Sequence, residues 1–448
     1  MICSKPCEKN CNGSPGDSPV LVTFGRITVY LLCVMLLSGC SLIQNRENED
    51  ICLTGRQRVL RALDPSNLSV NVLGRSGLIS TALPSSSMNP FKPLKELDPD
   101  GVRSGRPFSM RLADGTIVGG LFFEYDDGTS DPKPLLMASF GFLQDRWGTE
   151  AAKVYELYLE KPSERIPAHV LILDHPSAGT FLANNGYLSV GSYDDARMWI
   201  EIALKLRNDM KLSGIHLFGV SMSGQTVVHA LIEDTRLGLN LFNSGMAVSI
   251  APDFQKAPGI QLAQLETPKG VENPWAGYFK TVPKKSFVDM IGSLGLRMLI
   301  KKQFIPHYHY INTTDTEFDL KCSDALIFLR NAFDKRITLL REYKPDTWNT
   351  EFSLEDLDAF MASTRIAGVI GRVRTPLVLV SAFDDPAVQH TMFEEVMLAT
   401  EGNPWIAALE TDQGGHFGFN LPYGKNYIGG IIRLMINPQV LGTWSGSH

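Results

Sequence analysis

The feature that most constrains this chain is a serine placed between an apolar run and a helix-like segment. Residues 215–220 read Ile-His-Leu-Phe-Gly-Val, which is typical of a buried strand, and residues 225–232 read Gln-Thr-Val-Val-His-Ala-Leu-Ile, which favours a helix. Ser221 stands near the turn between them. A turn this sharp strains the backbone, so small residues are needed two positions before and after the serine. Gly219 meets that demand, whereas Ser223 carries a side chain where glycine is usual.

Two further polar motifs follow apolar runs later in the chain. Residues 376–381 lead to Asp384 and Asp385, and residues 405–411 lead to His416. The serine, the acid and the histidine therefore occur in a fixed order, each at the C-terminal end of a predicted strand. A serine hydroxyl becomes a good nucleophile when an imidazole takes its proton, and a carboxylate then fixes the imidazole tautomer. The order of the motifs favours nucleophilic catalysis.

Each motif also has a purely structural interpretation. The turn at Ser221 is compatible with packing or with phosphate binding, the Asp384-Asp385 pair with a solvated turn, and His416 with the cap of a strand. Asp253, which follows another apolar run, is an alternative acid. Asp174 has a similar position but comes too early in the chain, and we expect it to anchor a loop.

The remaining patterns predict a sheet that is mostly parallel and covered by helices on both faces. A tight turn at Asp114-Gly115 joins the two strands of a hairpin. Continuous apolar runs, typical of buried parallel strands, occur at residues 134–142, 169–174 and 246–252. The first of these runs contains Gly141, which lets the backbone approach a substrate closely.

These motifs resemble those of the α/β-hydrolases, and residues 376–388 and 414–419 are most similar to the YheT-like branch. The resemblance covers residues 106–253 and 365–440. It implies an α/β-hydrolase fold with a mostly parallel central sheet, helices on both faces and a helical cap insertion.

By position, the resemblance makes Ser221 the nucleophile, His416 the general base and Asp385 the acid. Asp385 is preferred to Asp384 because the acid of the family begins an Asp-x-x-Val motif. The backbone N–H groups of Phe142 and Met222 become the oxyanion donors. Phe140 departs from the family, which usually has His before the glycine of this loop.

A long insertion separates the two parts of the predicted core. Apolar residues recur at helical spacing in residues 287–298, and a second helical stretch covers residues 318–340, so we expect a cap above the serine. The apolar stripe either binds an acyl chain or packs within the cap. His307 and His309 lack acidic or cysteine partners at ligand spacing, and we expect a loop there and no metal. Two Lys-Lys pairs, at 284–285 and 301–302, fit solvated helix ends or a membrane-facing cap.

The N-terminal segment has the pattern of an export signal. Arg26 precedes an apolar run at residues 27–37, which is too short to span a membrane. The tetrapeptide Leu-Ser-Gly-Cys that ends at Cys40 resembles the lipobox of bacterial lipoproteins, which implies a lipid anchor on Cys40. An ordinary secretory signal and a short buried segment are the alternatives. In an exported chain Cys52 and Cys322 either form a disulfide or stay apart.

The composition is that of a globular protein and excludes some classes of function. Hydrophobic residues make up 44% of the chain, and the net charge of −6 argues against nucleic-acid binding. We expect five parts: a signal peptide, a tether and arm, the first part of the core, the cap, and the second part of the core, at residues 1–39, 40–105, 106–253, 254–364 and 365–448.

The expected function is that of a serine hydrolase, lipid-anchored in the bacterial cell envelope. It would act on a small-molecule ester or acyl substrate through an acyl-enzyme and without a metal or organic cofactor. One alternative is a non-catalytic binding protein that retains the fold, which the departures at Phe140 and Ser223 favour. Acyl transfer and hydrolysis of thioesters or amides use the same three side chains and stay open.

Overall fold

The structure is a computed structural model, and the residues it describes from Thr54 onward belong to one compact unit. It describes residues 53–67, 105–142, 144–146, 166–189, 191–253, 322–385, 388, 390–424 and 427–444. The predicted signal peptide with Cys40, the residue Cys52, the histidines 307 and 309, both lysine pairs and the predicted helix at 287–298 lie outside these ranges.

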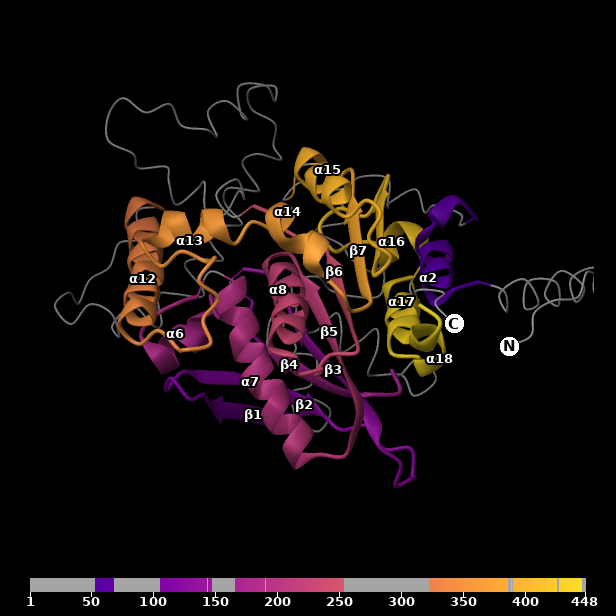
Figure 1. Ribbon diagram of the computed structural model, residues 1–448, viewed down its shortest axis with the longest axis horizontal. Coiled ribbons are helices and arrows are strands. Elements are labelled where there is room, and N and C mark those ends of the chain that lie inside the picture. The colour runs from indigo at the N-terminus through magenta and orange to yellow at the C-terminus, as the bar shows by residue number, and fades with distance from the viewer. Residues whose placement is uncertain are drawn as a thin grey trace, which may run out of the picture. The chain divides into compact units, whose positions relative to one another are not determined.

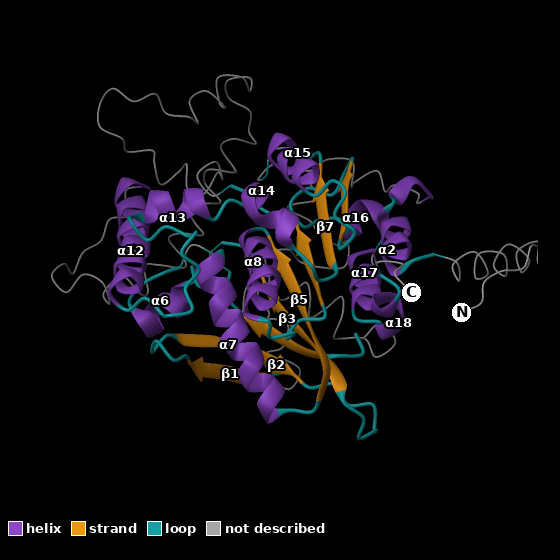
Figure 2. Cartoon of the chain, viewed as in Figure 1, coloured by secondary structure: helices purple, strands orange, loops and turns teal. Residues whose placement is uncertain are grey.

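Eight strands form one sheet, in the order β1-β2-β4-β3-β5-β6-β7-β8 (Figures 1 and 2). Strand β2 is antiparallel to both of its neighbours, and every other pair is parallel. The prediction of a mostly parallel sheet is therefore confirmed. The strands are β1 Arg106–Arg111, β2 Ile117–Phe123, β3 Lys133–Ser139, β4 His169–Leu173, β5 Leu212–Val220, β6 Ser244–Val248, β7 Leu377–Ala382 and β8 Ile406–Thr411.

The side chains of the central strands belong to two separate hydrophobic cores, one on each face of the sheet, because successive residues of a strand point to opposite faces. Leu135 and Met137 of β3 pack with one group of helices, α7 Tyr193–Asp209 and α8 Met222–Leu237. Leu136 of the same strand packs with the other group, α2 Gly55–Leu63, α17 Tyr427–Met435 and α18 Pro438–Gly442. In Figure 1, α7 and α8 cross in front of the strands. Helices on both faces, as predicted, bury the sheet.

The other described helices are short, apart from one. They are α6 Gly179–Asn185, α12 Cys322–Glu342, α13 Leu357–Ser363, α14 Ile366–Val369, α15 His390–Ala399 and α16 Asn420–Tyr423, with 3-10 turns at Pro65–Asn67 and Ile370–Arg372. Helix α12 covers most of the second helical stretch predicted in the insertion. None of the helices in the described ranges combines the length and the apolar character that a membrane-spanning segment needs.

Helix α2 lies within residues 40–105, for which the sequence predicted a tether and an arm and no helix. Its N-terminus is capped reciprocally: the Thr54 hydroxyl accepts from the Gln57 N–H, and the Gln57 side chain accepts from the Thr54 N–H. Val59 and Leu63 are fully buried against α17 and α18. A helix of nine residues depends on tertiary packing for its stability. Two apolar residues one turn apart provide that packing here.

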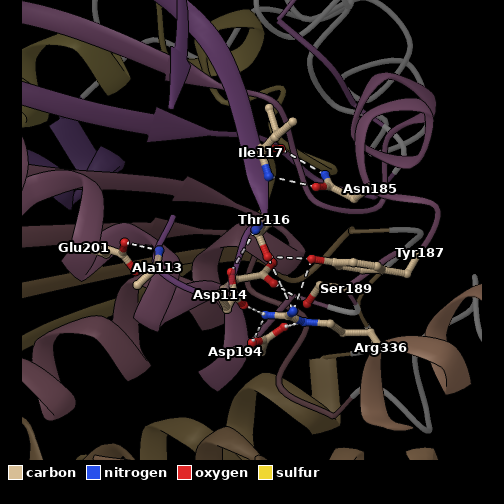
Figure 3. Close-up of polar contacts among 11 residues, drawn as sticks. Ala113, Asp114, Thr116, Ile117, Asn185, Tyr187, Ser189, Asp194, Glu201 and Arg336 are labelled. Carbon is tan, nitrogen blue, oxygen red and sulfur yellow. Dashed lines mark hydrogen bonds and ion pairs between the residues drawn. The ribbon is translucent and has the colours of Figure 1, made fainter. Parts of the chain in front are cut away.

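A buried arginine joins α12 to the rest of the fold (Figure 3). The Arg336 guanidinium donates to both carboxylate oxygens of Asp194 at 2.8 and 2.9 Å, and to Asp114 at 2.9 Å. It also donates to the Tyr187 hydroxyl at 3.2 Å and lies over the Tyr187 ring. The Arg336 cation thus connects α12 to the β1–β2 turn and to the start of α7.

Candidate active site

Ser221 occupies a strained backbone position between β5 and α8. Its φ and ψ are 58° and −118°, which non-glycine residues rarely adopt. The strand before it and the helix after it impose this geometry, and the Ser221 N–H donates to the Val248 carbonyl at 2.9 Å. A Cβ added at Gly219 would lie 2.2 Å from the Ser223 carbonyl oxygen, so a side chain at this position would clash. The tight turn predicted from the sequence is present.

Ser223 has a contact that explains a side chain at this position. Its hydroxyl donates to the Phe140 carbonyl at 2.5 Å, and the serine is buried. This bond ties the first turn of α8 to the end of β3 across 83 positions of sequence. The residue that departs from glycine thus joins the turn at Ser221 to the loop that follows β3.

Gly141 brings that loop against the serine side chain. A Cβ at Gly141 would lie 2.9 Å from Ser221 Cβ and 3.2 Å from Ser221 Oγ. Phe142, the next residue, is half-buried, with its ring 6.4 Å from the ring of Phe333 on α12. Met222 begins α8, and the first N–H groups of a helix have no carbonyl partner within it. The two predicted oxyanion donors thus lie on the two segments that meet at Ser221.

Asp174 and His175 hold the Phe142 loop in place, as the sequence analysis expected of Asp174. The Asp174 carboxylate accepts from the Arg146 backbone N–H at 2.8 Å and forms an ion pair with the Arg146 guanidinium at 2.5 Å. The His175 N–H donates to the Gln144 carbonyl at 3.0 Å. The Arg146 side chain also donates to the carbonyl of Gly120 in β2, which fixes the loop to the sheet. Arg146 gave no signal in the sequence.

Asp385 is the carboxylate that contacts His416. Asp385 Oδ2 lies 2.9 Å from His416 Nδ1, and the aspartate is buried. The Val388 N–H donates to the other oxygen, Oδ1, at 3.1 Å, which gives the Asp-x-x-Val spacing a physical reason. When Nδ1–H donates to a carboxylate, Nε2 keeps the lone pair and is able to take a proton.

Asp384 has a different contact. Its Oδ1 accepts from the Gly415 N–H at 2.8 Å, one residue before His416. Burial raises the pKa of Asp384 above its ordinary value, and the neighbouring Asp385 charge adds to the effect. Asp253, the alternative acid, forms an ion pair with Arg365 at 3.0 Å. Asp385 is thus the acid whose contact with the imidazole the structure shows.

Phe417 brings the histidine loop to the turn at Ser221. It has a φ of 69°, and its ring centroid lies 6.3 Å from that of Phe140 and 6.1 Å from that of Phe218. Phe140 precedes Gly141, and Phe218 lies three residues before Ser221. The residue after His416 therefore packs on the two segments that carry Ser221 and Gly141. No pattern in the sequence indicates this role of Phe417.

The described residues contain no group of three or more His, Cys, Asp or Glu side chains that could hold a metal ion. The residues described above include a serine hydroxyl, an imidazole paired with a carboxylate, and backbone N–H groups at a helix N-terminus, which are the groups that acyl-transfer chemistry uses.

Comparisons with known proteins give no family assignment from sequence. No family model matches the chain, and no curated protein matches it. Among solved structures, it is similar to the esterase Pf2001 of Pyrococcus furiosus, with 14% identity, 76% of this chain and 94% of that chain covered, and a TM-score of 0.43. For Est1E of Butyrivibrio proteoclasticus the values are 11%, 73%, 96% and 0.37, and for a bacterial membrane phospholipase A they are 12%, 76%, 91% and 0.40.

Similarity at this level says nothing about a substrate. The chain's own strand order carries the assignment, together with the antiparallel β2 and the turn that places Ser221 between a central parallel strand and a helix. The chain has the α/β-hydrolase fold.

Proposed function

We propose that the protein is a serine hydrolase that cleaves carboxylic esters through an acyl-enzyme intermediate. Ser221 is the nucleophile, His416 the general base and Asp385 the acid that orients the imidazole. The observation that carries the proposal is the 2.9 Å contact between Asp385 Oδ2 and His416 Nδ1, in a loop that packs on the strained turn at Ser221. A buried carboxylate paired with an imidazole is what a serine needs for activation at neutral pH.

In the proposed reaction His416 Nε2 takes the hydroxyl proton as Ser221 Oγ attacks the ester carbonyl. The N–H groups of Phe142 and Met222 hold the oxyanion of the tetrahedral intermediate, a contribution worth about 3 kcal/mol for one donor. The imidazolium then gives its proton to the leaving alcohol, and Asp385 stabilises the cation meanwhile. Water attacks the acyl-enzyme by the same steps and releases the acid and the free serine.

The experiment that tests the proposal is labelling of the purified protein with a fluorophosphonate probe. We expect labelling of the wild type at Ser221 and none of Ser221→Ala or His416→Ala, because the three side chains act as a unit. Hydrolysis of p-nitrophenyl esters should fall by several orders of magnitude in both variants. Folded wild-type protein that neither reacts with the probe nor hydrolyses esters would favour a non-catalytic binding protein with the same fold.

We further propose that the chain is anchored to a membrane of the bacterial envelope through a lipid on Cys40. The basis is the sequence alone, an apolar run followed by Leu-Ser-Gly-Cys. Expressed in a bacterium that processes lipoproteins, the wild type should partition into the membrane fraction, and Cys40→Ala should lose the lipid. An unmodified mature N-terminus at another residue would contradict the anchor and leave the hydrolase proposal untouched.

A further inference from the structure

Two fully buried ionisable side chains lie near the start of α8 and take no part in the proposed mechanism. His175 follows β4, and Asp195 lies in the first turn of α7. Each has one polar atom for which the described residues provide no hydrogen-bond partner, Nε2 of His175 and Oδ2 of Asp195. Such groups are costly inside a protein unless a partner satisfies them.

Both atoms lie close to one point beside Gly191. A Cβ at Gly191 would lie 3.2 Å from His175 Nε2, 3.5 Å from Asp195 Oδ2 and 3.4 Å from the Cβ of Met222. The two polar atoms are thus near enough to each other to share one water molecule as a hydrogen-bond partner. Met222, the residue directly after Ser221, lies beside the same point.

The other contacts of His175 fix what its Nε2 can do. The Ser177 backbone N–H donates to His175 Nδ1 at 3.1 Å, so Nδ1 is an acceptor, and the Ser177 hydroxyl at 2.7 Å then donates to it as well. Burial lowers the pKa of His175 to about 3, and the ring is neutral at physiological pH. In a neutral ring with an acceptor at Nδ1, the hydrogen is on Nε2. Nε2–H is therefore a buried donor in need of an acceptor.

The Asp195 side chain needs a partner at its second oxygen. Its Oδ1 accepts from the Ser189 hydroxyl. Burial, together with the charge of Asp194, raises the pKa of Asp195 well above its ordinary value. A protonated Oδ2 needs an acceptor and an ionised Oδ2 needs a donor, and a water molecule is able to serve as either. One carboxyl and an imidazole nitrogen that carries hydrogen are too few ligands for a metal ion.

We propose that a buried water molecule bridges His175 Nε2 and Asp195 Oδ2 and fixes the first turn of α8 against the loops that follow β4 and precede α7. Its effect on catalysis rests on the proposed function, since Met222 supplies a proposed oxyanion donor from that turn. His175 and Asp195 are thus positioning residues.

The direct test is a crystal structure of the wild-type protein at a resolution that shows ordered water. We expect one water within hydrogen-bond distance of both His175 Nε2 and Asp195 Oδ2. A direct His175–Asp195 hydrogen bond, or no water at this point, would overturn the proposal. This test needs no catalytic activity.

The second test is Gly191→Ala, whose methyl group would lie within 3.5 Å of both polar atoms and exclude the water. The matched control is Gly238→Ala at the other end of α8: both glycines have positive φ, 68° and 65°, but a Cβ at Gly238 has no atom within 4 Å. The cost of a positive φ is common to both variants. We expect Gly191→Ala to melt at a lower temperature than the control and to lose about tenfold or more in kcat with little change in KM.

Equal melting temperatures and equal kcat values in the two variants would refute the positioning role. If Gly191→Ala does not fold, the wild-type crystal structure decides. If the wild type itself neither labels at Ser221 nor hydrolyses esters, the proposed function fails, and the crystal structure still decides the water site.

Discussion

His416 Nδ1 lies 2.9 Å from Asp385 Oδ2, whereas the adjacent Asp384 accepts a hydrogen bond from the backbone of Gly415. Two neighbouring carboxylates therefore divide two tasks. Asp385 orients the imidazole, and Asp384 holds the glycine turn that carries it. Two adjacent aspartates leave the choice of acid ambiguous in the sequence, and their different hydrogen-bond partners distinguish them in the structure.

We predict that Asp385→Asn costs far more activity than Asp384→Asn. An amide at 385 no longer stabilises the imidazolium and favours the wrong tautomer, so kcat should fall about 10⁴-fold. At 384 the amide oxygen can still accept from the Gly415 N–H, and the loss should stay within about tenfold. Ester hydrolysis by variants with wild-type circular dichroism measures both. The reverse ranking would contradict the assignment of the acid.

A second prediction concerns the glycine that touches the nucleophile. Gly141→Ala would place a methyl group 2.9 Å from Ser221 Cβ and 3.2 Å from Oγ, so the serine side chain must move. A displacement of this kind should lower kcat about 100-fold. Fluorophosphonate labelling rates and ester kinetics report the change.

The matched control for Gly141→Ala is Gly368→Ala in α14, where an added Cβ has no atom within 4 Å. This variant should keep wild-type kinetics and stability. Wild-type labelling of Gly141→Ala would mean that the loop after β3 does not lie against the serine.

The strands and the turn at Ser221 were predictable because their signals are local. An apolar run that ends in Gly-x-Ser predicts strand, turn and helix from ten residues, and the structure gives β5 and α8 at these positions. The Asp-x-x-Val spacing is local as well, since the Val388 N–H donates to Asp385. Continuous apolar runs predicted the parallel strands because both faces of the sheet are covered.

What the sequence did not reveal depends on contacts between distant residues. The Ser223 hydroxyl donates to a carbonyl that is 83 positions away in the sequence. Arg336 donates to Asp194 and Asp114, which are 142 and 222 positions away. Asp194 and Asp195 interrupt the apolar face of α7 yet are buried. Hydrophobic periodicity assigns such acids to solvent, because the cation or polar group that satisfies them comes from another part of the chain.

A third prediction tests the link between α12 and the core that Figure 3 shows. Arg336→Met removes the cation and leaves Asp194 buried without a charge partner, which should lower the free energy of unfolding by about 3–5 kcal/mol. Arg372→Met is the control, because the Arg372–Glu351 pair is exposed at 49% and 54% and should contribute at most about 1 kcal/mol. Urea unfolding measures both. Equal losses would mean that Arg336 is not essential to the fold.

The last prediction is a pH dependence of stability that comes from a histidine in the sheet. His216 of β5 is 4% exposed, its Nδ1 lies 2.8 Å from the Ser244 hydroxyl, and that hydroxyl donates to the Met435 carbonyl. Burial lowers the pKa of His216 from 6.5 to about 4. As the pH falls below 6.5, His216 therefore binds a proton in the unfolded chain, whereas in the folded chain it binds one only near pH 4. The free energy of unfolding decreases as the pH falls through this window.

To isolate His216, the free energy of unfolding is compared between the wild type and His216→Asn at several pH values. Asparagine can donate to Ser244 but does not titrate, and all other ionisable groups are common to both proteins. The wild type should lose about 2 kcal/mol relative to the variant between pH 7.5 and pH 5, since one pKa unit corresponds to about 1.4 kcal/mol. Above pH 7 the difference should be constant. A difference that stays constant down to pH 5 would mean that His216 titrates alike in the folded and unfolded states, and that water reaches it inside the sheet.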